Sequence, residues 1–292
     1  MDVTTYTTAQ AFLTRAEAGF VADEAANNLI YGLARRLIDA PDFYATTPFF
    51  ATVDQAETVV VAALRTPPHN LLLYSHATPT DDERVIPALA SLAETLAGEK
   101  GTLPGVNGRS ELAEAFAAQW TARTDATAEI VREMRIFKLT EVNWPPLPSG
   151  RVRPATLADA DLLATWIRAF EWEALGTNAD TAPVPPLNRA RQMIEADSLF
   201  VWERTTGEIV SLAAASRATV RGRTVSLVYT PPEHRGQGYA SATVAALSDR
   251  ILQDGYDFCT LFTDLANPTS NHIYQVIGYR PVCDFTEYRF VG

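Results

Sequence analysis

The sequence predicts a mixed α/β fold with a central β-sheet flanked by helices, repeated in two halves of one chain. In the second half, apolar strands alternate with helical stretches in the order strand, glycine-rich turn, helix, strand, helix, strand. A similar alternation of strands and helices runs through the first half. Three prolines and a glycine fall within residues 143–150, which is typical of a semi-rigid linker. We therefore expect domains at residues 1–142 and 151–292, joined by the linker 143–150.

The first half has its helical and strand patterns in a clear order. We expect helices over 7–18 and 24–39, strands over 49–53, 58–64 and 70–75, helices over 84–99 and 109–124, and a strand over 134–141.

The second half opens with a short strand at Arg151, followed by a helix over 157–173 with Thr156 as N-cap and Asp159 at position N3. The remaining expected elements are a helix over 187–195, strands over 198–204, 209–217 and 223–229, a helix from about Ala240, a strand over 258–263, a helix from about Pro268 to Gly278, and a strand over 280–290.

Composition limits the classes of protein that this chain can belong to. Its 292 residues, 47% of them hydrophobic and 20% charged, suit a globular protein of about two domains. No run of about 18 apolar residues predicts a membrane span, and no secretory signal opens the chain, so we expect a cytoplasmic protein. Four histidines and two cysteines show no metal-ligand spacing, so no metal is expected.

The net charge of −11 is unevenly distributed. Residues 1–150 carry 11 basic and 19 acidic side chains, and residues 151–292 carry 13 and 16. This charge opposes binding to nucleic acid, whose backbone attracts clustered Lys and Arg. It favours a cationic substrate such as an amine, or it serves solubility alone.

Residues 228–241, Val-Tyr-Thr-Pro-Pro-Glu-His-Arg-Gly-Gln-Gly-Tyr-Ala-Ser, are the most informative stretch. An apolar strand ends before a loop that holds Gly236 and Gly238, and a helix follows. Glycines let backbone N–H groups approach a ligand closely, and the helix N-terminus adds about half a positive charge. The stretch therefore predicts a cradle for a pyrophosphate, with an ordinary strand-to-helix turn as the alternative. It is neither a Rossmann fingerprint nor a P-loop.

The spacing Arg235-x-x-Gly238-x-Ala240 resembles the acyl-CoA signature of the GNAT N-acetyltransferases. A second pattern of this family matches Asn267, Ser270, Tyr274, Gly278 and Tyr279 in register. The resemblance covers about 140 residues of the second half and is most specific over residues 225–280. It implies a tandem GNAT-like fold.

The first half would then be a degenerate copy of the same fold. Its corresponding loop contains no glycine, and Asp81, Asp82 and Glu83 lie at the start of the following helix. We expect this half to bind no CoA in the manner of the family, because such a loop would repel a pyrophosphate.

The resemblance implies an acetyl-CoA-dependent N-acetyltransferase that acts by direct transfer on a primary amine of a small molecule or peptide. The residues it assigns to the cofactor are Val228, Tyr229, Thr230, Arg235, Gly236, Gln237, Gly238, Tyr239, Ala240, Ser241, Asn267 and Asn271. Tyr274 would protonate the departing thiolate, since a phenol with a pKa near 10 keeps its proton at neutral pH. The alternative for Tyr274 is a core aromatic.

The general base is one of several glutamates in the second half. Among Glu171, Glu173, Glu203 and Glu233, we assign the role to Glu173 or Glu233, although exposed glutamates are usually only solvated. Trp166, Phe170 and Trp172 line the acceptor pocket or belong to the core.

Three other interpretations remain open. The protein could be a non-catalytic acyl-CoA sensor, a tandem enzyme similar to mycothiol synthase, or a protein whose first half presents a surface to a partner. A homodimer is also possible.

Overall fold

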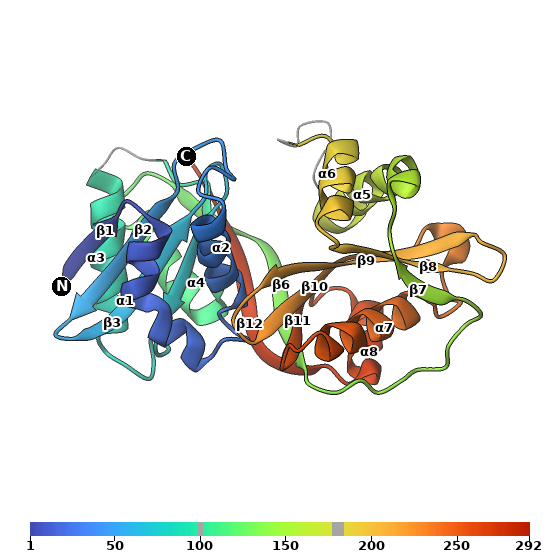
Figure 1. Ribbon diagram of the computed structural model, residues 1–292. Coiled ribbons are helices and arrows are strands. Elements are labelled where there is room, and N and C mark those ends of the chain that lie inside the picture. Colours follow the sequence, from blue (N-terminus) through green and yellow to red (C-terminus); the bar gives the residue numbers. More distant parts are fainter. Residues whose placement is uncertain (99–101, 177–183) are drawn as a thin grey trace. The chain divides into compact units, whose positions relative to one another are not determined.

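The computed structural model describes residues 1–98, 102–176 and 184–292, which form two compact units (Figure 1). The first unit consists of Met1–Phe137, Phe262–Asn267 and Pro281–Gly292, and the second consists of Lys138–Leu261 and Pro268–Arg280. Each unit contains β-strands covered by helices, so the expected mixed α/β class is confirmed. In the described part of the chain, no helix has the length and apolarity that crossing a membrane requires.

The first unit is built on a mixed sheet with the strand order β1-β2-β3-β4-β5-β12-β6. Its strands are β1 (Asp2–Tyr6), β2 (Phe49–Gln55), β3 (Thr58–Arg65), β4 (Leu71–Ser75), β5 (Gly105–Arg109), β6 (Thr127–Leu139) and β12 (Arg280–Val291). The first four strands pair antiparallel, β4 and β5 pair parallel, and β12 pairs antiparallel with β5.

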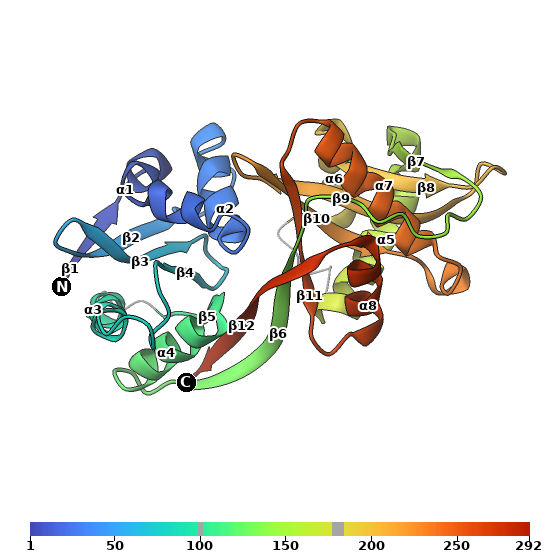
Figure 2. The ribbon, with the colours of Figure 1, turned by 90° about the horizontal axis from the view of Figure 1, so that it is seen from below.

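Alternate residues of these strands face two separate cores, because successive side chains of a strand point to opposite faces. Leu71 and Leu73 pack under α3 (Val85–Gly98) and α4 (Ser110–Thr121). Leu72 and Tyr74 pack against α1 (Ala9–Ala22) and α2 (Asn28–Asp39) on the other face. Figure 2 shows the two helix pairs on opposite sides of this sheet.

The C-terminal strand β12 contributes most of its length to the first unit. Its residues Phe285 to Arg289 pair with Arg109 to Gly105 of β5, and Phe285 and Phe290 lie in the first unit's two cores. The compact units therefore do not follow the boundaries 1–142 and 151–292 along the chain. The reason is that β5 has a free edge in its own half, and a strand from the end of the chain completes it.

Two strands, β1 and β5, were not expected from the sequence. β5 is Gly-Val-Asn-Gly-Arg, and two glycines in five residues are typical of a turn rather than a strand. β5 is extended because it pairs with β4 on one side and β12 on the other. Its own five residues do not predict this pairing.

The second unit has the strand order β11-β10-β9-β8-β7. Its strands are β7 (Arg151–Pro154), β8 (Leu199–Glu203), β9 (Ile209–Ala218), β10 (Gly222–Tyr229) and β11 (Phe258–Asp264), and its helices are α5 (Ala160–Leu175), α6 (Pro186–Glu195), α7 (Tyr239–Gln253) and α8 (Pro268–Ile277). Figure 1 shows α5 and α6 on one side of this sheet and α7 and α8 on the other. These bounds lie close to those expected from the sequence.

The start of α5 shows how the local sequence sets an element. Thr156 and Asp159 form the expected capping box around a short 3₁₀ turn, Leu157–Asp159, that leads into α5. The guanidinium of Arg153 on β7 donates to Asp159 at 2.8 Å, which joins the strand to the cap. This cap fixes the direction in which α5 leaves the sheet.

Candidate functional site

The candidate site of the second unit begins at a distortion in β10. The parallel pairing of β10 with β11 covers Gly222, Arg223 and Thr224, while β10 itself continues to Tyr229. On its other edge the pairing with β9 shifts register between Ser226 and Tyr229, and Leu227 has a φ of 51°. A leucine in the left-handed region is strained, and strain of this kind is concentrated at functional positions. The bulge takes Leu227 and Val228 out of the regular ladder with β9, which resumes at Tyr229 opposite Leu212.

The loop after β10 carries its two glycines in the left-handed region of φ. Pro232–His234 forms one 3₁₀ turn, after which Gly236 has a φ of 74° and Gly238 a φ of 81°. A Cβ built on either glycine would meet no protein atom within 4 Å. The two glycines are therefore required by the backbone conformation, and the space in front of them is open.

Gly238 is also the N-cap of α7, and it has no side chain with which to cap the helix. The first intrahelical bond runs from the Ala242 N–H to the Gly238 carbonyl at 3.0 Å. The N–H groups of Tyr239, Ala240 and Ser241 thus precede the helical ladder. Such N–H groups, together with the positive end of the helix dipole, are suited to an anion.

The side chain of Arg235 lies across the start of this loop. Its Nε donates to the Thr230 carbonyl at 2.8 Å, and one terminal nitrogen donates to the Glu173 carboxylate at 2.6 Å. The other oxygen of Glu173 accepts from the Tyr229 hydroxyl at 3.1 Å. The structure therefore joins one expected base to two expected cofactor-binding residues, Tyr229 and Arg235. Burial, and then the Glu173 carboxylate, raise the pKa of Tyr229.

The other three glutamates make different contacts. Glu171 is buried and pairs with Arg189 of α6. Glu203 pairs with Arg153 at 2.8 Å at the β7 edge of the sheet, and this hydrogen bond lowers its pKa. Glu233 is exposed in the 3₁₀ turn, where its backbone carbonyl accepts from Gln237 at 3.4 Å. Of the four candidates, Glu173 is the one whose carboxylate contacts the loop.

Tyr274 lies on α8, on the side of the sheet that also carries α7 (Figure 1). Its side chain is buried, with its ring 6.0 Å from that of Tyr279 in an edge-on arrangement. Burial raises the pKa of Tyr274 to about 12. The phenol therefore holds its proton throughout the neutral range.

The remaining expected site residues lie around the start of α8 and on α5. Asn267 directly precedes α8, and its backbone N–H donates to the Asp264 carbonyl at 3.0 Å, while Asn271 lies in the first turns of α8. Trp166 packs on the Tyr229 ring with 6.3 Å between centroids, which places it in the core. Trp172 is 69% exposed on α5 and thus remains available to a ligand.

In the first unit the parallel strands β4 and β5 also pair over only a short stretch, as β10 and β11 do in the second, but the loop that follows is different. β4 and β5 pair only at Leu71 and Leu72 within their described residues. In the loop that follows, one oxygen of Asp82 accepts from the Arg84 backbone N–H at 2.9 Å, and the other accepts from the Arg84 side chain at 2.6 Å and contacts His76 at 2.8 Å. These hydrogen bonds hold the pKa of Asp82 well below its usual range. The loop before α3 thus holds a hydrogen-bonded carboxylate, whereas the loop before α7 holds two glycines.

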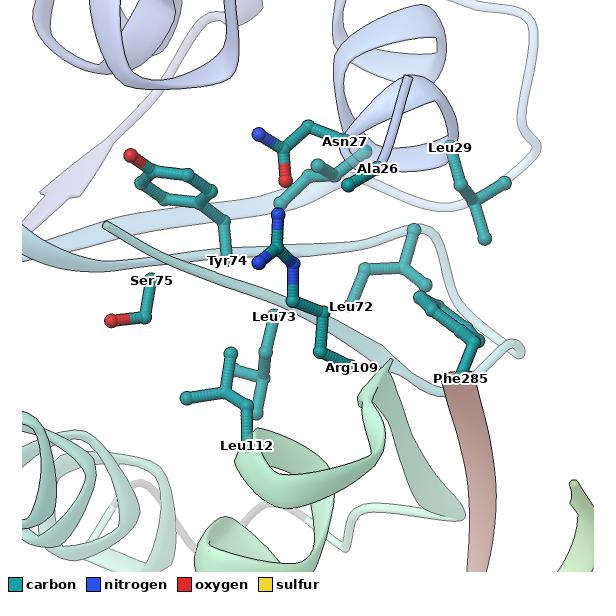
Figure 3. A pocket seen from close by; sticks show the side chains of 11 residues that line it. Ala26, Asn27, Leu29, Leu72, Leu73, Tyr74, Ser75, Arg109, Leu112 and Phe285 are labelled. Carbon is teal, nitrogen blue, oxygen red and sulfur yellow. The ribbon is translucent and has the colours of Figure 1, made fainter. Parts of the chain in front are cut away.

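Arg109 lines two hollows of the first unit. The first, drawn in Figure 3, is nearly filled by side chains, with Arg109 directed between Asn27 and Tyr74. The second has a volume of about 250 Å³. It is lined by Ser75, Ala77, Thr78, Pro79, Arg109, Ser110, Glu111, Leu112, Cys283 and Asp284.

The sequence alone did not point to three features of these sites. They are the bulge at Leu227, the Tyr229 hydroxyl on Glu173 and the hydrogen bonds of the Asp82 carboxylate. The acidic run that includes Asp82 indicated a repelled anion but not the hydrogen bonds that this carboxylate makes. For the bulge and the tyrosine, no sequence pattern exists that could have shown them.

Comparisons with known proteins agree with this architecture. A model of the FR47-like protein family matches residues 205–290. No curated protein sequence matches the chain. A solved Drosophila protein aligns with 99% of this chain and 98% of its own, at a TM-score of 0.69 and 15% identity.

Two further solved structures are named as GNAT proteins. A GNAT-family acetyltransferase from Colwellia psychrerythraea aligns over 99% of both chains, at a TM-score of 0.60 and 12% identity. A tandem GNAT protein from the clavulanic acid biosynthesis pathway aligns over 99% of this chain and 98% of its own, at a TM-score of 0.58 and 16% identity. The chain therefore has the fold of these tandem GNAT structures, and residues 205–290 are similar to the FR47-like family.

Proposed function

We propose that the second unit transfers an acetyl group from acetyl-CoA to a primary amine of a small molecule or peptide. The observation that carries this proposal is the open glycine loop before α7. There the positive φ angles of Gly236 and Gly238 and the first N–H groups of the helix create a surface suited to a diphosphate.

The bulged end of β10 gives the proposed reaction its second part. By resemblance to the family, backbone groups of Val228, Tyr229 and Thr230 hold the pantetheine arm and polarise the thioester carbonyl. A backbone donor that faces the developing oxyanion lowers the barrier by about 3 kcal/mol. The strained Leu227 supports this assignment, because the bulge takes Leu227 and Val228 out of regular pairing with β9.

The chemistry requires one bond to form and one to break. The amine nitrogen attacks the carbonyl carbon, the C–N bond forms, and the C–S bond breaks. Glu173 accepts the proton that the amine loses, directly or through water, and Tyr274 donates a hydrogen bond to the leaving sulfur. With a pKa of about 12, the Tyr274 phenol is less acidic than a thiol, so it stabilises the developing thiolate more than it delivers a full proton.

A thiol-release assay tests this function. The full chain is mixed with acetyl-CoA and a panel of amines, polyamines, amino acids and aminoglycosides. We expect at least one class of amine to raise CoA release well above the rate without amine. Binding of acetyl-CoA without amine-dependent release across the whole panel would instead favour the sensor interpretation.

A further inference from the structure

We infer that Arg235 exchanges partners, leaving Glu173 for a diphosphate oxygen when acetyl-CoA binds, and so couples cofactor binding to release of the base. This inference rests on the proposed function of the glycine loop. Arg235 directly precedes Gly236 of the loop. In the structure its guanidinium donates to the Glu173 carboxylate at 2.6 Å. In the structure, the carboxylate that should accept the amine proton is therefore engaged in an ion pair with Arg235.

The pair is placed where exchange is easy. The side chains of Arg235 and Glu173 are 48% and 41% exposed, respectively. An ion pair with this exposure changes an equilibrium constant only a few-fold. A diphosphate offers Arg235 a stronger, charge-assisted partner that can bind two nitrogens of the guanidinium at once.

Two further hydrogen bonds keep both side chains in place during the exchange. The Nε of Arg235 donates to the Thr230 carbonyl at 2.8 Å, which holds the guanidinium at the loop whichever partner it has. The Tyr229 hydroxyl donates to the other oxygen of Glu173 at 3.1 Å. When Arg235 leaves, Glu173 therefore stays beside Tyr229 with one oxygen available to an acceptor ammonium.

Replacing Glu173 changes the affinity for the cofactor in opposite directions, depending on whether Glu173 competes with the diphosphate or only positions Arg235. If Glu173 competes with the diphosphate, replacing it by Gln frees Arg235 and tightens cofactor binding. If Glu173 only positions Arg235, the same replacement weakens binding. The gain must also disappear when Arg235 is absent, because coupling between two sites is reciprocal.

The test is a calorimetric double-mutant cycle on the full chain, with CoA as the probe and pantetheine as a probe without diphosphate. We expect Glu173→Gln to bind CoA about two- to five-fold more tightly, and Arg235→Gln to bind it more weakly. The double variant should match Arg235→Gln. Pantetheine affinity should be the same in all four proteins.

Glu195→Gln is the matched control, since it removes one exposed carboxylate of α6 in the same unit. It should leave CoA affinity unchanged. Unchanged or weaker CoA binding by Glu173→Gln, or an equal gain with and without Arg235, overturns the exchange. If the unmodified chain binds no CoA, the proposed function fails instead.

Discussion

Tyr274, the proposed donor, and Glu173, the proposed base, belong to helices on opposite faces of one sheet. Glu173 belongs to α5 and Tyr274 to α8, and the end of β10 lies between these two layers (Figure 1). One group is partly exposed and ionic, and the other is buried and neutral. The burial that keeps Tyr274 protonated makes it suitable as a donor and unsuitable as a base.

Replacing Tyr274 by Phe should slow turnover with little effect on cofactor affinity. The hydroxyl acts only through a hydrogen bond to the charge that develops on the leaving sulfur, so we expect kcat to fall about 10- to 100-fold. Steady-state kinetics measures this fall, and calorimetry with CoA should show an affinity within about two-fold of the unmodified chain. A kcat equal to that of the unmodified chain would show that another group or solvent stabilises or protonates the leaving thiolate.

The same tyrosine makes stability sensitive to alkaline pH. Its folded pKa of about 12 lies above the ordinary value of 10, so the folded state binds this proton more tightly than the unfolded state. The contribution is fully present below pH 10 and is lost as pH rises to about 12, by about 3 kcal/mol.

Urea unfolding at pH 9 and pH 11 measures this loss in the unmodified chain and in Tyr274→Phe. The variant should lose less stability over that interval. Equal losses in the two proteins would contradict the buried, protonated state of Tyr274.

At the scale of elements, the loop between β10 and α7 was predictable because its information is local. Glycine spacing, the prolines and the helix start lie within residues 228–241, and the structure has each of them as expected. The Arg235–Glu173 pair was not predictable, since its members lie 62 residues apart and only the packing of α5 on β10 brings them together. The glutamates with other partners show why residue type alone could not select the base.

Two alanine substitutions separate the backbone cost of this loop from its ligand role. Gly238 has a φ of 81° and Gly207, between β8 and β9, a φ of 84°, and a Cβ on either meets no protein atom. Gly238→Ala and Gly207→Ala should therefore cost similar stability, about 1 kcal/mol each.

Only Gly238→Ala should weaken CoA binding, because only its Cβ enters the proposed diphosphate surface. Unfolding curves and CoA titrations of both variants check the two statements. Equal CoA affinity in the two variants would place the ligand elsewhere.

At the scale of the whole molecule, the order of most strands and helices followed from the sequence, but the assignment of β12 did not. Residues 280–290 form a strand as expected, yet from Pro281 onward they belong to the first unit through β5. Nothing in a strand's own residues states which distant edge it will pair with. The predicted division at residues 143–150 does not account for the return of residues 281–292 to the first unit.

Removal of residues 281–292 should therefore destabilise the first unit specifically. Phe285 and Phe290 would be lost from its cores, and β5 would lose its antiparallel neighbour. Hydrogen exchange should show protection falling in β5 and α4 while α7 and β9 keep theirs. Loss of protection in the second unit alone would contradict this assignment of β12.

The central claim, that residues 235–241 bind the diphosphate of acetyl-CoA, is tested most directly by one calorimetric titration. Acetyl-CoA is titrated into the unmodified chain and into Gly238→Glu, whose side chain brings bulk and negative charge into the open space before α7. We expect one acetyl-CoA per chain, because the loop before α3 in the first unit carries acidic residues and no glycine. We expect no measurable binding in the variant. Equal binding by the two proteins would contradict the claim.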